Sequence, residues 1–297
     1  MKVSKEKIFK EEIKDWWSRH SQDYVDPGEV DHLGIDLNLS DKEFRNVLRK
    51  SDKNFFLDAY FAQDKNKIFF SKLIPNDLNG KKILEIGCGL GAHTELFSQK
   101  KSNVTSIDLA PTSIKVTKRR LRLKKLKANV IEADAENLPF PDNSFDIIWS
   151  WGVIHHSPNT KKCAEEIERV LAKGGKLYIM LYNKNSMYNW INVIFRYGIL
   201  KGKLLSMSIQ DLHNRYTDGK SDNGAPLSKY YTRKQIKENL FPNLNIISQT
   251  CFEKKHVFSF WVPASFRRKF ETLIPDSLHS WIWSRVGFLL FTIAEKR

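Results

Sequence analysis

The sequence predicts an α/β fold: a mostly parallel, doubly wound, Rossmann-like β-sheet with helices on both faces. From residue 82 onward, short apolar segments alternate with longer segments whose apolar residues recur at helical spacing. The first apolar segment also runs directly into Gly87, Gly89 and Gly91, which is typical of a strand that stops at a tight turn before a helix. The chain of 297 residues is long enough for one large domain with additions.

Seven segments have the composition of strands, and each is bounded by polar or glycine residues. In chain order they are 82–86, 103–109, 128–134, 145–150, 176–182, 245–253 and 286–296. A helix is expected at 161–173, because its apolar residues form one stripe, and Gly174-Gly175 should end it.

Two segments lack this alternation. Residues 1–79 carry amphipathic helical patterns and no comparable strand, and residues 183–243 carry an aromatic helical pattern followed by a glycine-rich loop. Segments inserted beyond the carboxyl ends of such strands commonly build the ligand site. We therefore expect an N-terminal helical lid that covers the substrate at 1–79, and a main domain at 80–297 with a lid insertion at about 183–243.

The composition excludes several classes of protein. Cys88, Cys163 and Cys251 show no paired spacing, which excludes a disulfide scaffold and a cysteine-based zinc site and suits a reducing compartment. The N-terminus has no signal-peptide pattern, and no apolar run is long enough to span a bilayer. A cytoplasmic location is the expectation. The net charge of +15 favours an anionic partner or substrate, although a lysine-rich surface more often only keeps a protein soluble.

The glycine-rich turn is the first candidate site. Gly87-x-Gly89-x-x-Ala92 fits the dinucleotide fingerprint, and Asp108, about twenty residues further on, fits a ribose ligand. At this point a nicotinamide dinucleotide therefore remains an alternative cofactor. Glu85, however, would crowd and repel a pyrophosphate, whereas it would suit a ligand with an ammonium group. The pattern thus favours an adenosyl cofactor without phosphate.

Three further segments follow strands three, four and five: ADAENLPFPDNSFD (133–146), SWGVIHHSPN (150–159) and RVLAKGGKLYIM (169–180). With the glycine turn and Asp108, they resemble the class I S-adenosylmethionine-dependent methyltransferases, in the small-molecule, methyltransferase-11-like branch. The resemblance covers roughly residues 80–183. It implies a seven-stranded sheet whose last strand is antiparallel beside the fifth and sixth. It also implies S-adenosylmethionine as cofactor and methyl transfer as the activity.

The resemblance also implies which residues bind the cofactor. The methionine and ribose part would lie on the glycine turn and on the end of strand four, the ribose hydroxyls on Asp108, and the adenine beside strand three. The implied set is Glu85, Gly87, Cys88, Gly89, Gly91, Asp108, Leu109, Asp134, Ala135, Ser150 and Trp151.

Methyl transfer from a sulfonium is an in-line displacement that needs a base only if the acceptor must lose a proton. His155 and His156, after strand four, are the candidate catalytic bases. No metal is expected, because SWGVIHH lacks the carboxylates that precede the single histidine of magnesium-dependent quinone O-methyltransferases. Second-rank candidates in the lids are His32, His213, Tyr216 and Asp218. Aromatic residues that could close the pocket, or only pack the lids, are Trp16, Trp17, Tyr24, Trp190, Phe195 and Tyr197.

The expected acceptor is an O, N or S atom of a small-molecule metabolite. An anionic metabolite would complement the positive net charge of the chain. A competing hypothesis is an RNA or DNA methyltransferase that uses the basic run 117–127, but this run is expected on a solvated helix face. The chain also lacks the motifs of adenine-N6 and cytosine-5 enzymes. A lipid or quinone methyltransferase that contacts a membrane through 189–205 also fits the sequence, as does a non-catalytic cofactor-binding protein. The acceptor atom and the oligomeric state are not specified by the sequence.

Overall fold

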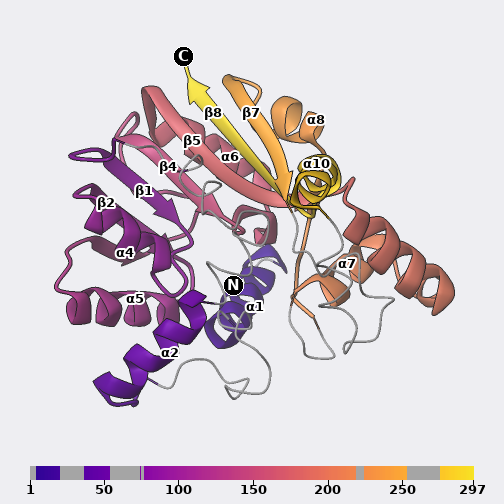
Figure 1. Cartoon of the computed structure of the whole chain (residues 1–297), viewed down its shortest axis with the longest axis horizontal. Helices are drawn as coiled ribbons and strands as arrows, with labels where there is room; N and C mark the ends of the chain where they lie inside the picture. The colour runs from indigo at the N-terminus through magenta and orange to yellow at the C-terminus, as the bar shows by residue number, and fades with distance from the viewer. Residues whose placement is uncertain (1–4, 21–36, 54–73, 75–76, 219–223, 253–274) are drawn as a thin grey trace.

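The computed structural model describes residues 5–20, 37–53, 74, 77–218, 224–252 and 275–297. Its centre is one twisted sheet (Figure 1), in the order β3-β2-β1-β4-β5-β8-β7. The first five of its main strands run parallel to one another. Their bounds are Lys82–Ile86 (β1), Asn103–Asp108 (β2), Asn129–Glu132 (β3), Phe145–Trp151 (β4) and Leu171–Asn183 (β5).

The two closing strands are β7 (Leu244–Phe252) and β8 (Leu289–Lys296). Strand β8 runs antiparallel between β5 and β7, which confirms the expected position of the last strand. An eighth, two-residue strand, β6 (Tyr230–Tyr231), which the sequence did not predict, pairs with the end of β5. The last strand was expected from residue 286, but helix α10 (Asp276–Val286) ends at that position and β8 begins only after Gly287.

The helices between the parallel strands are α4 (Ala92–Gln99), α5 (Pro111–Lys124) and α6 (Thr160–Val170). The expected end of α6 at Gly174-Gly175 is wrong, because the helix ends at Val170 and β5 begins at Leu171. The register between β4 and β5 shifts between Phe145 and Ile147, so the two glycines lie in an irregular part of the strand. A β-bulge accounts for glycines at such a position as well as a helix end does.

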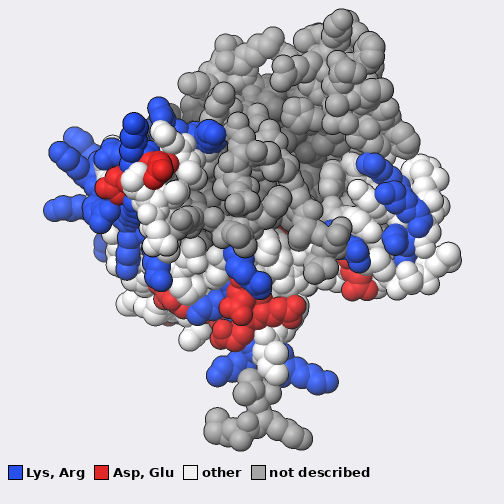
Figure 2. Space-filling model, turned by 90° about the horizontal axis from the view of Figure 1, so that it is seen from below, with Lys and Arg blue, Asp and Glu red and all other residues white. Residues whose placement is uncertain are grey.

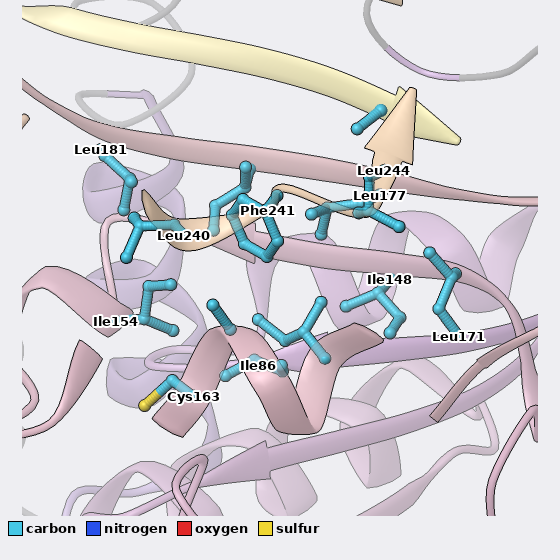
Figure 3. Close-up of a cluster of buried hydrophobic side chains, with 14 of the residues drawn as sticks. Ile86, Ile148, Ile154, Cys163, Leu171, Leu177, Leu181, Leu240, Phe241 and Leu244 are labelled. Carbon is cyan, nitrogen blue, oxygen red and sulfur yellow. The ribbon is translucent and has the colours of Figure 1, made fainter. Parts of the chain in front are cut away.

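Two apolar cores lie on opposite faces of the sheet. Figure 3 shows the first, in which Cys163 of α6 and Leu240 and Phe241 of the later insertion pack against strand residues such as Ile148 and Leu177. The second contains Phe97 of α4 with Trp149 of β4 and Phe291 of β8. Because the central strands are buried on both faces, their sequences read as apolar runs rather than as alternating patterns.

The remaining described segments come from the N-terminus and from the insertion after β5. At the N-terminus, they are helices α1 (Lys5–His20) and α2 (Asp41–Lys53). After β5 come a π-type helix η3 (Tyr188–Leu200), a 3₁₀ turn η4 (Lys203–Leu205) and α7 (Ile209–Thr217). Two short helices, α8 (Arg233–Gln235) and η5 (Ile236–Leu240), follow β6. None of the helices described is long and apolar enough to cross a membrane.

Candidate active site

A pocket opens at the carboxyl ends of β1 to β4, under helix α1. Its walls come from the turns that follow these four strands and from α1 and α2. The lining residues on which the site depends are Lys10, Trp17, Gly87, Cys88, Gly89, Asp108, Leu109, Asp134, Ala135, Trp151, Val153 and His156. Strand ends of a parallel sheet converge on one edge, and this convergence brings residues from 87 to 156 into one pocket.

The turn after β1 lies close to the turn after β4. Gly87 has φ of +81°, and a Cβ at this position would lie 2.2 Å from a Val153 methyl carbon. Its N–H and that of Cys88 donate to the carbonyl of Ile107 in β2, at 2.8 and 3.0 Å. The turn therefore needs glycine both for its backbone conformation and for close packing. The rest of its surface is left facing the pocket.

Asp108 faces the pocket from the end of β2. Its two carboxylate oxygens accept the N–H groups of Gly89, at 2.9 Å, and Ala110, at 2.8 Å. Burial raises the pKa of this carboxyl, while the backbone N–H groups of Ala110 and Gly89 act in the opposite direction. The Ser113 side chain and the Leu109 N–H also act to lower the pKa of this carboxyl. Asp108 thus fixes the turn, and its position in the pocket lining places it where ribose hydroxyls could bind.

Glu85 lies behind the turn instead of in the pocket wall. It is 1% exposed, and its Oε2 accepts the hydroxyls of Thr94 and Ser106 at 2.5 and 2.7 Å. Burial raises its pKa to about 7. His93 Nδ1 lies 3.8 Å from Oε1, but burial lowers the pKa of that imidazole to about 3, so the contact is not an ion pair. The expectation that Glu85 contacts the ligand directly is not supported by this geometry.

Gly91 and Ser150 also lie outside the pocket lining. A Cβ on Gly91 would lie 2.9 Å from the Thr117 side chain, so this glycine allows α5 to approach the turn. Ser150 is 1% exposed within β4. Side chains alternate between the faces of a strand, and its neighbour Trp151 is the one that reaches the pocket.

Helix α1 is attached to the expected adenine side of the pocket by Lys10. The Lys10 ammonium lies 2.7 Å from Asp134 Oδ2 and 2.5 Å from Glu136 Oε2. Asp134 Oδ1 also accepts the N–H of Glu136 at 2.9 Å. The Asp134 carboxylate is therefore shared between its own turn and the helix above it. Sequence patterns contain no signal for Lys10, because its partners lie more than a hundred residues away.

The two histidines lie in the 3₁₀ turn η2 (Ile154–His156) and differ in their surroundings. His155 is fully buried, does not line the pocket, and contacts the rings of His156 and Tyr182. Neither of its ring nitrogens is hydrogen-bonded to a described residue. Burial lowers its pKa well below the ordinary value. The structure therefore places His155 behind the pocket lining, and its role as a base stays a prediction.

His156 does line the pocket, where the Trp17 ring meets it edge-on at 4.7 Å. Its Nδ1 lies 2.6 Å from the carbonyl oxygen of Leu227. A carbonyl can only accept, so Nδ1 carries the proton of the neutral ring and Nε2 carries the lone pair. Nε2 has no hydrogen-bond partner among the described residues. Burial lowers the pKa of this imidazole, whereas Asp218 and the Leu227 carbonyl act to raise it.

Asp218, a second-rank candidate, lies beside His156, with Oδ2 4.0 Å from Nε2. Its oxygens accept the hydroxyls of Tyr182 at 2.5 Å and Ser228 at 2.7 Å. The distance to the imidazole is too long for a hydrogen bond but close enough to stabilise an imidazolium. Tyr182 and Leu227 were not identified from the sequence, because their roles come from contacts between distant segments.

The other lid candidates are not brought to the pocket. His213 is buried, shares a hydrogen bond of 2.9 Å with Asn189, and stacks on Tyr230; burial lowers its pKa to about 4. Tyr216 stacks on Tyr197. The remaining aromatic candidates divide into the buried Trp16, the exposed Trp190 and Phe195, and Tyr24, which with His32 lies outside the described residues.

The basic run on α5 is only partly the solvated face that was expected. Arg120 is 2% exposed and pairs with Glu95 of α4 and Asp52 of α2, each at 2.7 Å. Arg119 binds Asp41 of α2 at 2.8 Å. These two arginines fasten α2 to the main domain, and the more exposed Arg122 also lies 3.5 Å from Asp41. The helix therefore has a structural role that sequence reasoning missed.

S-adenosylmethionine fits the described pocket. In the turn after β1, a Cβ on Gly89 would meet no protein atom within 4 Å, so the backbone there is open to a ligand; Asp108 offers ribose acceptors, and Leu109 and Ala135 offer apolar surface for an adenine. No phosphate needs to be placed beside the carboxylates of Asp108 and Asp134. Among the residues that the structure describes, no group of acidic, cysteine and histidine side chains could hold a metal ion.

The region that contains the parallel strands and the pocket turns matches a known protein family. Residues 84–179 match the family model described as "Methyltransferase domain". The phthiotriol/phenolphthiotriol dimycocerosates methyltransferase of Mycobacterium tuberculosis is 36% identical over 117 residues, which are 38% of this chain and 43% of that protein. A ubiquinone/menaquinone biosynthesis C-methyltransferase of Shewanella sediminis is 34% identical over 139 residues, 44% of this chain and 55% of the relative. The chain spans about half the length of the curated relatives it matches.

Solved structures share the fold at low sequence identity. A SAM-dependent methyltransferase from Methanosarcina mazei has a TM-score of 0.53 at 20% identity, over 76% of this chain and 96% of the other. The [4+2]-cyclase SpnF has a TM-score of 0.50 at 15% identity, over 88% and 84% of the two chains. These similarities show the fold alone, since one fold can carry different reactions.

Proposed function

We propose that this chain, whose central residues form a class I S-adenosylmethionine-dependent methyltransferase domain, transfers the cofactor's methyl group to a hydroxyl oxygen of a small, largely apolar acceptor. When bound, the cofactor supplies an electrophilic methyl group on a sulfonium. The protein's own residues then have three tasks: to hold the donor, to orient the acceptor, and to take the proton that a hydroxyl must lose.

One observation carries the proposal: His156 lies in the same pocket as the glycine turn and Asp108. Its Nδ1 is fixed by the Leu227 carbonyl. Its Nε2 is buried beside Asp218 and has no hydrogen-bond partner among the described residues, so it is the nitrogen that can take a proton once the ring or its cover moves to expose it. Because burial lowers the pKa of His156, the ring is neutral at pH 7 and competent as a base. The imidazolium formed on proton transfer would lie beside the Asp218 carboxylate, which favours it electrostatically.

The acceptor's character follows from the lining and agrees with the relatives. Ile13, Trp17, Val153, Ile154 and Pro158 provide an apolar surface on the His156 side of the pocket. The names of the matched relatives refer to phthiotriol-type and quinone compounds. The second relative is named a C-methyltransferase, so its acceptor atom differs from the hydroxyl oxygen proposed for this chain. Methylation of a hydroxyl oxygen or of a ring carbon releases a proton in either case, and a base can take it.

Nucleic acid is the weaker candidate as the acceptor. Part of the basic run on α5 is engaged with α2 through Arg119 and Arg120. The pocket is also covered by Lys10, Ile13 and Trp17 of α1, which favours a small acceptor over a polymer.

The test is transfer of isotope-labelled methyl groups from S-adenosylmethionine to three sets of acceptors: apolar alcohols and phenols, apolar amines, and total RNA. We expect transfer to the first set, at a rate that falls at acidic pH as His156 becomes protonated. Because burial lowers the pKa of His156, the fall should occur below the ordinary histidine pKa near 6.5. Transfer to RNA with none to the hydroxyl compounds would contradict the proposal. Transfer to amines without this pH dependence would contradict the role of His156.

A further inference from the structure

The segment η3–η4, after β5, exposes an unusual amount of apolar surface. Leu205 is 93% exposed, Leu200 60% and Ile199 58%. We call this surface the η3 patch; its members are Trp190, Phe195, Ile199, Leu200, Leu204, Leu205 and Ile209. Single exposed apolar residues are common, but a contiguous set of large ones marks an interaction surface.

Helix η3 buries polar residues and exposes large apolar ones. Its buried residues are Asn189, Asn192, Val193 and Gly198, whereas Trp190 and Phe195 face outward. Asn189 is held in place, because its amide donates to the Lys184 carbonyl at 2.8 Å and its Oδ1 meets His213 Nε2 at 2.9 Å. A helix at a solvent-exposed surface normally buries its apolar stripe and exposes its polar face. The buried asparagines therefore hold the apolar face of η3 outward.

The charge around the patch is mainly positive. Residues 184–210 contain Lys184, Arg196, Lys201 and Lys203 and no aspartate or glutamate, and the exposed Asp211 follows at the start of α7. Lys201 and Arg196 lie over the Tyr197 ring, at 4.9 and 5.4 Å from its centroid. Figure 2 shows lysine and arginine among uncharged atoms at the right-hand end of the molecule, and in Figure 1 η3 extends to the same side, beyond α7.

We propose that the η3 patch docks on an anionic lipid bilayer, an inference that rests on the proposed function by giving its apolar acceptor a source. Aromatic and aliphatic side chains mixed with lysine and arginine suit a charged membrane interface. The cores of protein–protein interfaces, by contrast, are depleted in lysine. A bilayer is therefore the partner that matches both the apolar and the basic character of the patch.

Contacts connect the patch to the pocket. Gly198 of η3 packs against Leu212 of α7, where an added Cβ would lie 3.3 Å from a leucine methyl. The carbonyl of Asn214 in α7 accepts the N–H of Ala225 at 2.9 Å, and Leu227, two residues further on, binds His156. The segment that docks thus continues into the wall that holds the base. An acceptor leaving the bilayer would meet the pocket on its His156 side.

Vesicle co-sedimentation of the full chain tests the docking. Vesicles of phosphatidylcholine, with and without phosphatidylglycerol, are compared for the wild type, L200E/L205E and K201E/K203E. Two controls match the changes in polarity and charge: I247E, at an exposed position on β7, and K234E/K237E, at exposed positions on α8 and η5. Each variant is also titrated with S-adenosylhomocysteine to show that its pocket is folded.

We expect the wild type and both controls to bind the phosphatidylglycerol vesicles, and each patch variant to bind at least about tenfold more weakly. Cofactor affinity should be equal in all of them. No binding by the wild type, or equal binding by patch and control variants, would overturn the docking. Self-association that L200E/L205E abolishes, without vesicle binding, would also overturn it and assign the patch to a second copy of the chain. Absence of S-adenosylhomocysteine binding in the wild type would instead overturn the proposed function.

Discussion

The two ends of the pocket are held together in different ways. At the cofactor end, Asp108 accepts the N–H groups of Gly89 and Ala110, so the parts of the site fix one another over a short stretch of chain and across neighbouring strands. At the acceptor end, His156 is held by the carbonyl of Leu227, which lies 71 residues further along the chain. The cofactor end thus follows from the sheet, whereas the acceptor end depends on the packing of the segment inserted after β5. Substitutions at the two ends should therefore affect different measurable quantities.

The largest expected effect is at the acceptor end. His156→Gln removes the base but keeps a polar side chain, so turnover should fall by roughly 10²–10⁴. The affinity for S-adenosylhomocysteine, measured by calorimetry, should stay near that of the wild type. His155→Phe is the matched control, because His155 packs on Tyr182 away from the pocket. A loss of turnover in His155→Phe equal to that in His156→Gln would remove the distinction between the two histidines.

The next effect concerns stability at the cofactor end. Burial raises the pKa of Glu85 from 4.5 to about 7, so the folded protein holds a proton that the unfolded chain releases between these values. The associated stabilisation is present below pH 4.5 and lost as pH rises through 7. In the wild type, the free energy of unfolding should decrease by about 3 kcal/mol at most over this range. In Glu85→Gln, this decrease should be absent. Urea unfolding of both proteins across this pH range measures the difference. If the free energy of unfolding had the same pH dependence in both proteins, the raised pKa of Glu85 would be refuted.

Asp108→Ala should weaken S-adenosylhomocysteine binding by about 1–3 kcal/mol, because ribose hydroxyls would lose their acceptor in a closed site. Turnover at saturating cofactor should change much less. Asp142→Ala serves as control, since this carboxylate is exposed and pairs with Arg169, away from the pocket lining. An unchanged affinity in Asp108→Ala would mean that the ribose lies elsewhere.

The smallest effect is expected where the lid meets the cofactor end. Lys10→Ala removes the ion pairs of α1 with Asp134 and Glu136, and should raise the acceptor KM by an amount worth roughly 1 kcal/mol. Lys14→Ala is the control on the same helix, since Lys14 pairs with the more exposed Glu132. Equal KM values for the two variants would show that the Lys10 contact does not position the lid.

The sheet and most of the cofactor end could be predicted from the sequence, because their signals are local. The apolar runs, the glycines with positive φ and Asp108 at the end of β2 lie within short segments. Even there, Glu85, Gly91 and Ser150 were expected to contact the ligand, and none of them is in the pocket lining. Strand position alone did not reveal which side of the turn each side chain would take.

The acceptor end could be predicted only in outline. The sequence favoured His155 and His156 equally, and only the packing of Tyr182 and Leu227 distinguishes them. Lys10 and Arg120 likewise have roles set by partners from other elements. No periodicity or spacing reports such contacts, because they depend on how the lid helices pack on the finished sheet.

The most direct measurement is an experimental structure of the complex with S-adenosylhomocysteine. We expect the ribose hydroxyls on Asp108, the adenine beside Leu109 and Asp134, and the sulfur directed toward the space in front of His156 Nε2. An adenine against His156, or a sulfur directed away from it, would contradict a single pocket in which donor and base meet.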